Sequence, residues 1–494
     1  MFARSPSPRR IVPVLAAGLA LVAAACTDPP TTGGSGGQVV EAGNGQVKLP
    51  ECPLKALDDA TGRTKVTMWY GGIGGPVEDT LQAMVKKFNA SQDKVTIQAS
   101  NQGASNAEVY RKFESAASAN SKQLPDILYA ENTQLQVLSD SNLILPAQSC
   151  MEADGYDETQ ILPAVRSAFT VHDVLYPGYM NVTSQVLYYN KAHFLKAGLD
   201  PEKPPQTLAE VHDAAVKLKK AGIPKPLSFK TSHAVFENWL SGEGIDVVNN
   251  NNGHDGLATK ATFDTPEARS NLEWLQQMNK EGLLNPFANT EGSIDHYLAL
   301  VTQQSSMLME TSTATSTLAQ AISGTLTPQD VGSNFDASVI DKSQLVPGTG
   351  PFPGPKAGGK SRPGGSAFFI VNAGPKAEQA GAWKFMKFML QPENAKTWHT
   401  KGGFLPTVKA VEDEPDVQKF WTDSLAGVLV KPAVDQLDRA DPDNAPPLIG
   451  PYTDFTDDVQ KAMEGVLFNH EAVGPALAKA QQQVTASLKR YAGT

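Results

Sequence analysis

The chain has 494 residues, of which 40% are hydrophobic and 19% are charged, and its formal net charge is −10. This composition is that of an ordinary globular protein, and the length allows two to three domains. An acidic chain without a basic stripe cannot displace the counterions of nucleic acid, so we expect no nucleic-acid partner. Beyond the N-terminal segment, no hydrophobic run is long enough to cross a bilayer.

The N-terminus predicts export and a lipid anchor. Three arginines precede an apolar run at residues 11–25 (IVPVLAAGLALVAAA), and Cys26 follows it directly. Positive charge, a short apolar stretch and small residues describe a secretory signal, and the cysteine after it resembles the lipidated residue of bacterial lipoproteins. We expect a signal peptide at 1–25, lipidation of Cys26 and a location on the extracellular face of the cell membrane. A plain secretory signal cut at the same place is the alternative.

The next segment predicts a tether and a disulfide. Residues 27–45 are rich in Gly, Ser, Pro and Thr, which favours a flexible coil, and we expect a tether at 26–51. Cys52 and Cys150 then form an even pair in an oxidising compartment. A disulfide between them would close a loop of about 100 residues and stabilise the start of the folded body. Two buried free thiols are the alternative.

Strand and helix patterns follow in chain order. Residues 65–70 (KVTMWY), 94–99 (KVTIQA) and 125–129 (PDILY) have strand patterns, and apolar residues between them recur at helical spacing. This order predicts a mostly parallel sheet with helices on both faces, an α/β fold. Later predicted strands lie at 186–190 and 367–371, and later predicted helices lie at 208–220, 377–390 and 459–490.

Three motifs point to a family. The sequences VLYYNK and AGLDPEKPPQTLAEV, at 186–191 and 197–211, and QPENAKTWHTKGGFLPT, at 391–407, resemble the extracellular solute-binding proteins of ABC importers, of the sugar and glycerol-3-phosphate-binding type. The resemblance runs from about residue 65 to residue 491. It implies a two-lobed, periplasmic-binding-protein-like α/β fold with the ligand cleft between the lobes. Open α/β sheets do bind ligands beyond the carboxyl ends of their strands.

The resemblance also implies the domain organisation and the partners. It places lobe 1 at 52–177 plus 364–411 and lobe 2 at 178–363 plus 412–494, joined by a hinge that the chain crosses more than once. A small-molecule ligand (a sugar, a polyol or a glycerophosphodiester) would bind between the lobes and pass to permease subunits in the membrane. We expect a monomer that uses no cofactor and no metal.

Candidate ligand-binding residues come partly from the residues themselves and partly from the resemblance. Trp69 and Tyr70 end the first predicted strand, where their rings would either stack on a sugar or pack in the core. The resemblance adds Glu131, whose carboxylate would accept hydrogen bonds from vicinal hydroxyls or, alternatively, form a salt bridge at the hinge. It also adds hydroxyl, aromatic and backbone positions on both lobes: Thr183, Trp239, Thr311, Ser312, Gly364, Gly365 and Phe404.

One departure from the family concerns phosphate. Members that bind glycerol-3-phosphate have an arginine near the segment that reads PPLIGPYTDF here, where this chain has Leu448 and Ile449. Without a guanidinium, a phosphate monoester loses strong charge-assisted hydrogen bonds. The sequence therefore favours an uncharged oligosaccharide or polyol, or a phosphodiester, over glycerol-3-phosphate.

Two other classes of function remain as alternatives. The chain has no GxSxG motif, and its eight histidines include no HxxxH pair, so neither a serine hydrolase nor a zinc site is indicated. Asp126 and Glu131 are conceivable as the carboxylate pair of a glycan-acting hydrolase. A surface lipoprotein or adhesin is the third class. A binding protein leaves its ligand unchanged, whereas a hydrolase turns it over.

Overall fold

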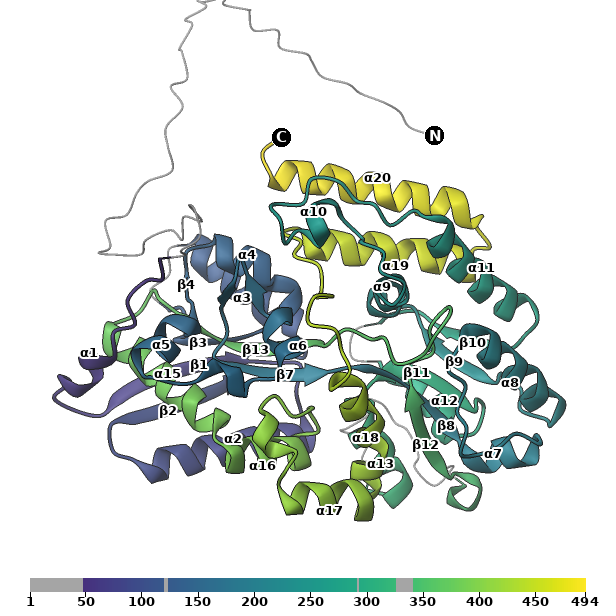
Figure 1. Ribbon diagram of the computed structural model, residues 1–494, viewed down its shortest axis with the longest axis horizontal. Helices are drawn as coiled ribbons and strands as arrows, with labels where there is room; N and C mark the ends of the chain where they lie inside the picture. Colours follow the sequence, from purple (N-terminus) through teal and green to yellow (C-terminus); the bar gives the residue numbers. More distant parts are fainter. Residues whose placement is uncertain (1–47, 120–122, 291–292, 326–340) are drawn as a thin grey trace, which may run out of the picture. The chain divides into compact units, whose positions relative to one another are not determined.

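The computed structural model describes residues 48–119, 123–290, 293–325 and 341–494 (Figure 1). The expected signal peptide, Cys26 and most of the expected tether lie outside these described residues. The described residues form one compact unit, which is built around two large β-sheets. Each sheet carries its own helices and forms the centre of one α/β lobe. We call these lobe 1 and lobe 2.

Lobe 1 contains a mixed sheet with the strand order β2-β1-β3-β13-β4, and β7 also pairs with β13. The early strands are parallel to one another, as the alternating patterns predict. The strand β13 runs antiparallel to β3 because the chain returns from lobe 2 and enters the sheet at its cleft edge. The sheet is therefore less parallel than predicted. Its strands are β1 (Thr64–Tyr70), β2 (Val95–Asn101), β3 (Ile127–Glu131), β4 (Ile144–Leu145), β7 (Tyr179–Thr183) and β13 (Gly364–Val371).

Lobe 2 contains a second mixed sheet with the order β10-β9-β11-β8-β12. In this sheet β9 is parallel to β10 and β11, whereas β8 is antiparallel to both of its neighbours. All six residues of β8 are buried, which explains its continuous apolar and aromatic sequence. The strands are β8 (Gln185–Asn190), β9 (Leu227–Lys230), β10 (Leu284–Phe287), β11 (Met307–Thr311) and β12 (Pro347–Pro351).

Helices cover both sheets (Figure 1). Lobe 1 has α1 (Leu54–Asp58), α2 (Gly75–Ser91), α3 (Asn106–Ser118), α4 (Leu135–Asp140), α5 (Ala147–Ala153), α6 (Pro163–Ala168), α15 (Lys376–Leu390) and α16 (Pro392–Gly402). Lobe 2 has α7 (Lys191–Lys196), α8 (Leu208–Lys220), α9 (His233–Ser241), α10 (Asn249–Asn252), α11 (Pro266–Lys280), α12 (Asp295–Val301), α13 (Ala314–Ser323), α19 (Tyr452–Phe468) and α20 (Val473–Tyr491). Between them lie α17 (Pro415–Asp423) and α18 (Leu425–Leu437). None of the helices in the described ranges is long and apolar enough to cross a membrane.

Local chemistry explains where individual helices begin and end. The helix α8 has the predicted bounds because Thr207 and Glu210 form a capping box at its start, while three lysines lie in its last turn. The predicted helix at 459–490 is instead two helices, α19 and α20. The chain turns between them at His470, which has a positive φ of 57°, and such a residue interrupts a right-handed helix.

The hinge lies where the chain passes from the sheet of one lobe to the sheet of the other. The strand β7 pairs in lobe 1 and β8 pairs in lobe 2, so the first crossing is at Ser184, a few residues after the expected boundary at 177. The return crossing joins β12 to β13. A third segment, which includes α18, binds to this hinge, since the Gln436 side-chain amide donates to the Gln185 carbonyl at 2.8 Å.

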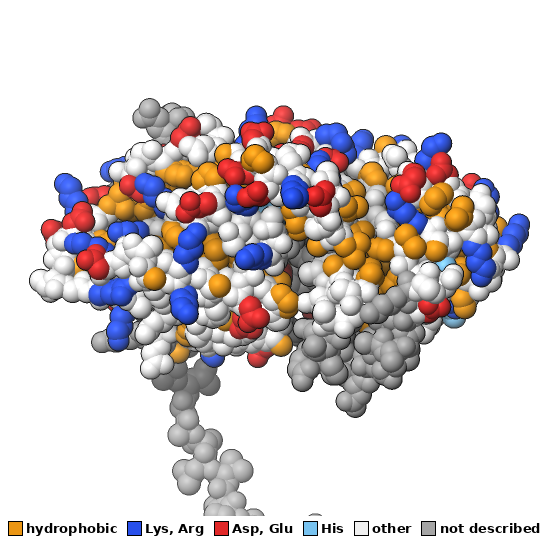
Figure 2. Space-filling model, turned by 90° about the horizontal axis from the view of Figure 1, so that it is seen from below, with side chains coloured by type: hydrophobic (Ala, Val, Ile, Leu, Met, Phe, Trp, Pro, Cys, Tyr) orange, Lys and Arg blue, Asp and Glu red, His pale blue; other side chains and the backbone are white. Residues whose placement is uncertain are grey.

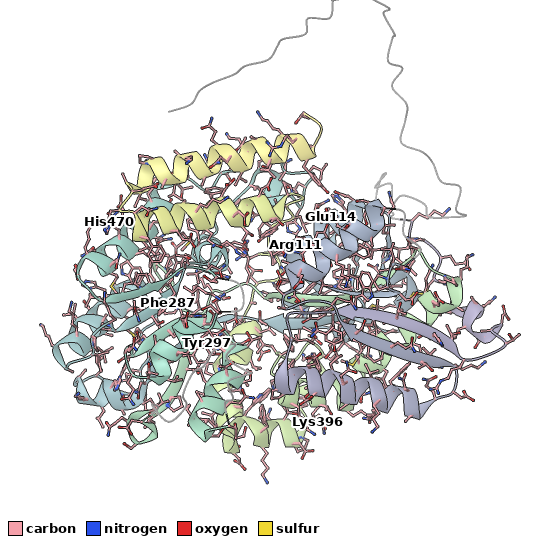
Figure 3. All side chains as sticks on the ribbon, turned by 180° about the vertical axis from the view of Figure 1, so that it is seen from behind. Arg111, Glu114, Phe287, Tyr297, Lys396 and His470 are labelled. Atoms are coloured by element: carbon pink, nitrogen blue, oxygen red, sulfur yellow. A yellow bond between two sulfur atoms is a disulfide. The ribbon has the colours of Figure 1, made fainter. Side chains whose placement is uncertain are left out.

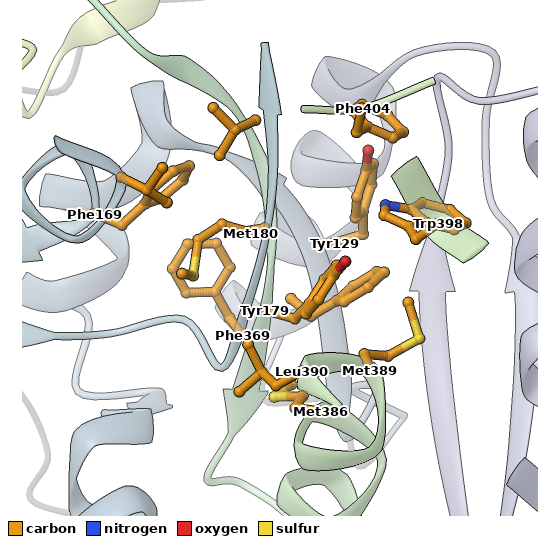
Figure 4. Close-up of a cluster of buried hydrophobic side chains, with 14 of the residues drawn as sticks. Tyr129, Phe169, Tyr179, Met180, Phe369, Met386, Met389, Leu390, Trp398 and Phe404 are labelled. Carbon is orange, nitrogen blue, oxygen red and sulfur yellow. The ribbon is translucent and has the colours of Figure 1, made fainter. Parts of the chain in front are cut away.

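Two features stabilise lobe 1. A disulfide joins Cys52 to Cys150 with a Cα–Cα distance of 4.9 Å, as the even cysteine pair predicts. The second feature is the core, which aromatic and methionine side chains from β3, β7, β13, α15 and α16 fill (Figure 4).

On the face shown in Figure 2, lysines and arginines are interspersed with aspartates and glutamates over the described atoms.

Candidate functional site

A cavity of about 560 Å³ lies between the lobes, beyond the carboxyl ends of β1, β3 and β11. Lobe 1 contributes Gly72, Ile73, Gly74, Gly75, Pro76, Val77, Asn106, Tyr129, Glu131, Thr183, Gly365, Ser366, Lys401, Gly402 and Phe404. Lobe 2 contributes Tyr297, Thr311, Thr313, Ser316, Thr317 and Gln320. Five of the sequence-predicted residues therefore meet at one cavity: Glu131, Thr183, Thr311, Gly365 and Phe404.

The Glu131 carboxylate is held in a fixed position at the end of β3. Glu131 is the N-cap of the 3-10 helix η1 (Asn132–Gln134), and it forms a capping box with Gln134. The Asn106 side-chain amide donates to Glu131 Oε1 at 2.9 Å and also to the Ser366 hydroxyl at 2.9 Å. This carboxylate still has lone pairs for ligand hydroxyls, because an ionised carboxylate offers about four acceptor sites.

The Asn106 side chain has an unused acceptor. Its Oδ1 atom is buried and forms no hydrogen bond within the described part of the chain. A buried polar atom without a partner is costly, so such atoms are usually satisfied by protein, water or ligand. Asn106 therefore holds Glu131 with its amide nitrogen, while its oxygen is buried close to Gly72.

Aromatic rings form another part of the lobe 1 wall. Phe404 stacks on Trp398 with ring centroids 5.5 Å apart and an interplanar angle of 10°, and Figure 4 shows the Tyr129 ring beside both. Trp398 is oriented by its indole N–H, which donates to Asn181 Oδ1 at 2.7 Å. Burial raises the pKa of Tyr129 to about 12, so its hydroxyl stays protonated.

Lobe 2 presents hydroxyls to the cavity. The hydroxyls of Thr311 and Thr313 lie 2.6 Å apart, and Thr313, Ser316 and Thr317 lie at or near the start of α13, whose first turn has no acidic residue. Tyr297 of α12 also lines the cavity, and Figure 3 labels its side chain. Burial raises the pKa of the Tyr297 hydroxyl well above its ordinary value, so this group also remains protonated.

A buried ionic group lies behind these hydroxyls. Glu310 accepts a hydrogen bond from the Thr311 amide at 2.8 Å and contacts His296 Nε2 at 2.9 Å. Burial alone would raise the pKa of Glu310, but the Lys230 ammonium and the His296 and Thr311 hydrogen bonds lower it to about 2. The end of β11 is therefore anchored by a carboxylate that stays ionised at neutral pH.

Gly365 is required by its surroundings. Its φ of 129° is rare for a residue with a side chain, and an added Cβ would lie 2.1 Å from the Asn181 carbonyl oxygen. Its amide donates to Asn132 Oδ1 at 3.2 Å. The glycine thus lets β13 approach β7 closely at the cavity edge.

The other sequence-predicted residues lie away from the cavity. Trp239 is fully buried in lobe 2, where its indole N–H donates to the Pro353 carbonyl. Tyr70 is buried, and its hydroxyl donates to Glu78. Trp69 is half-buried under the Lys112 ammonium. Ser312 is buried at the hinge, where its amide donates to the Ser184 carbonyl. Gly364 begins β13 next to the cavity without lining it.

Several cavity residues escaped the sequence analysis, among them Asn106, Tyr297 and Lys401. Asn106 is the first residue of α3, after its N-cap Ser105, Tyr297 lies on the short helix α12, and Lys401 is one of many lysines. Lys401 and Glu131 are the charged side chains among the described residues that line the cavity. A polar residue at the start of a helix that follows a predicted strand was the one available signal, because such positions face the carboxyl edge of the sheet.

Arginine and metal ligands are both missing from this cavity, as far as the described residues go. Leu448 and Ile449 are buried, and no arginine lines the cavity. Arg362, in the connection between β12 and β13, is buried against Asn444, with 2.6 Å between its Nη2 atom and Asn444 Oδ1. Across the described ranges, no cluster of three or more His, Cys, Asp or Glu residues could hold a metal ion.

Comparisons with known proteins identify a family and similar proteins. The model of a family described as bacterial extracellular solute-binding protein matches residues 83–424, which is more than half of the chain. The sn-glycerol-3-phosphate-binding periplasmic protein UgpB of Escherichia coli (strain K12) is 26% identical over 380 residues, which are 74% of this chain and 80% of that protein.

Solved structures share the fold. A cyclic alpha-maltosyl-1,6-maltose binding protein from Arthrobacter globiformis has a TM-score of 0.67 and 23% identity, covering 87% of this chain and 100% of that one. UgpB from Mycobacterium tuberculosis in complex with glycerophosphocholine has a TM-score of 0.66 and 16% identity, with the same coverage. At these identities the likeness is one of fold.

Proposed function

Because the chain belongs to the bacterial extracellular solute-binding protein family, we propose that it captures a carbohydrate, a polyol or a glycerophosphodiester between its two lobes. The observation that carries this proposal is the Glu131 carboxylate, which Asn106 holds at a cavity that both lobes line. A volume of about 560 Å³ is in the range of small-molecule sites.

The ligand class follows from the chemistry of the walls. The Glu131 carboxylate on lobe 1 would accept hydrogen bonds from ligand hydroxyls, and the hydroxyls on lobe 2 can donate or accept. Phe404 offers a ring for the apolar face of a sugar or a polyol. With no arginine among the described lining residues, a phosphate monoester would lack a bidentate partner, so a phosphodiester or an uncharged ligand fits better.

The mature protein would act as the lipid-anchored, monomeric binding subunit of an ABC importer. Lipidation at Cys26 and a flexible tether would keep it at the extracellular face of the membrane, where it could deliver ligand to the permease subunits. The lipoprotein-like N-terminal sequence supports the anchor, and the family supports the transport role.

A thermal-shift screen tests the binding function. The panel consists of maltose, a cyclic malto-oligosaccharide, glycerol, glycerophosphocholine and glycerol-3-phosphate. A ligand that binds the native state at 100 times its Kd stabilises it by about 2.7 kcal/mol, so at least one compound should raise the Tm, and mass spectrometry should recover that compound unchanged. If no sugar, polyol or glycerophosphodiester raises the Tm, or if the ligand is hydrolysed, the proposal is wrong.

A further inference from the structure

A hydrogen bond connects the two lobes away from the ligand cavity. The Tyr491 hydroxyl, at the end of α20 on lobe 2, donates to Asp140 Oδ2, at the end of α4 on lobe 1, at 2.6 Å. Neither residue lines the cavity. Figures 1 and 3 show the end of α20 beside α3, which carries Arg111 and Glu114.

The Tyr491 ring is positioned by its own lobe. It packs directly on Gly450, where an added Cβ would lie 2.2 Å from the ring. Burial and the Asp140 carboxylate raise the pKa of Tyr491, so the hydroxyl remains a donor at physiological pH. The glycine therefore provides the space that lets this tyrosine reach across to lobe 1.

Asp140 is positioned by a helical segment that begins at the cavity. Glu131 caps η1, η1 continues into α4, and α4 ends at Asp140. The Gln136 side-chain amide donates to both Asp140 carboxylate oxygens at 3.0 Å. The cavity carboxylate and the acceptor of the interlobe hydrogen bond thus lie at opposite ends of one short, capped segment.

We propose that the Tyr491–Asp140 hydrogen bond is a latch that holds the two lobes together and thereby sets ligand affinity without contacting the ligand. The part that concerns affinity rests on the proposed function. A hydrogen bond to a charged group at a solvent-exposed site would bias the equilibrium between closed and open lobes by about tenfold. Because the latch favours the closed arrangement before ligand arrives, a ligand that binds the closed lobes would bind up to about tenfold more tightly.

Small-angle X-ray scattering of the ligand-free protein tests the latch. Tyr491→Phe keeps the ring that packs on Gly450 and removes only the hydroxyl. The matched control is Tyr189→Phe, because the Tyr189 hydroxyl donates to the Pro201 carbonyl at 2.7 Å within lobe 2. We expect Tyr491→Phe to increase the radius of gyration and Tyr189→Phe to leave it unchanged.

A second variant and a second readout complete the test. Asp140→Ala removes the acceptor from the other lobe and should reproduce the expansion, while circular dichroism should show unchanged helix content in all variants. Scattering curves for Tyr491→Phe and Asp140→Ala that superimpose on the wild-type curve would overturn the proposal. Since this measurement uses no ligand, failure of the latch is distinguishable from failure of the binding function, which the thermal-shift screen reports.

Discussion

Asn106 and Glu131 form a hydrogen-bonded pair at the wall of the cavity, with 2.9 Å between Asn106 Nδ2 and Glu131 Oε1. The two residues come from different elements: Asn106 begins α3, and Glu131 ends β3. The pair fixes the carboxylate in one orientation, and the Glu131 carboxylate lies at the cavity that both lobes line.

Asn106→Asp should weaken ligand binding by more than Asn106→Ala. The aspartate would place a second carboxylate next to Glu131, and two like charges at hydrogen-bond distance repel each other. We expect about a tenfold loss of affinity for the alanine variant, from the lost hydrogen bonds, and a larger loss for the aspartate variant. Calorimetric titration with the ligand from the thermal-shift screen measures both, and equal affinities for wild type and Asn106→Asp would contradict the role of this pair.

Removal of the disulfide should destabilise the protein without changing its fold. A disulfide typically stabilises a protein by about 2–4 kcal/mol, mainly by lowering the entropy of the unfolded chain. The double variant Cys52→Ser/Cys150→Ser should therefore unfold at lower urea concentration, as followed by tryptophan fluorescence. Cys26→Ser is the control and should unfold as the wild type does. A urea midpoint for the double variant equal to that of the control would show that the bridge contributes nothing.

Stability should fall as the pH rises through 7, in part because of Glu378. Burial, together with the hydrogen bond and the negative charge of the Asp126 side chain, raises the pKa of Glu378 to about 7. Between its ordinary pKa of 4.5 and about 7, the folded protein binds this proton and the unfolded chain does not. The stabilisation is complete below pH 4.5 and is lost as the pH rises through 7.

Glu378→Gln imitates the protonated side chain and should remove part of this pH dependence. We expect the variant to be more stable than wild type at pH 8, by about 1 kcal/mol after allowance for solvent screening, and to differ little at pH 5. Urea titrations at both pH values measure it, with the exposed Glu273→Gln as control. If the stability of wild type and of Glu378→Gln depends equally on pH, Glu378 is not a source of the pH dependence. A weaker residual dependence is expected from Glu412, because burial and Asp438 also raise its pKa to about 7.

Cys26→Ser should release the protein from the membrane. The prediction rests on the apolar run that ends at this cysteine, since a serine cannot carry the thioether-linked lipid. Cell fractionation and immunoblotting should find wild type in the membrane fraction and the variant in the soluble or secreted fraction. If the variant stays membrane-bound as firmly as wild type, lipidation at Cys26 is wrong.

The fold was largely predictable because its elements have strong local signals. The alternating residues of β1 and the capping box of α8 predict these elements nearly to the residue. The antiparallel direction of β13 was not predictable from local pattern, because it depends on the chain returning from the other lobe. The break between α19 and α20 depends on one residue with a positive φ, His470, which periodicity does not reveal.

The site was predictable only in part. The family resemblance pointed to Glu131, Thr183 and Phe404, which lie at the cavity. A resemblance can identify such residues because it transfers positions at strand ends and in loops, where local pattern says little. Trp239 shows the limit of residue type as a signal, since an aromatic ring fills a core as readily as it covers a ligand, and here it packs between Phe229 and Phe352. Asn106 gave only a positional signal, as a polar residue at the start of a helix that follows a strand.

One calorimetric experiment tests the central claim, that Glu131 binds a hydroxyl-bearing ligand in the cavity between the lobes. Wild type and Glu131→Ala are titrated with the ligand found in the thermal-shift screen, and Glu152→Ala, an exposed carboxylate outside the cavity, is the control. A hydrogen bond to a charged group contributes about 1.5–3 kcal/mol, so Glu131→Ala should bind about tenfold to a hundredfold more weakly than wild type and the control. Unchanged affinity in Glu131→Ala would contradict the account, because the carboxylate that organises this cavity would then not bind the ligand.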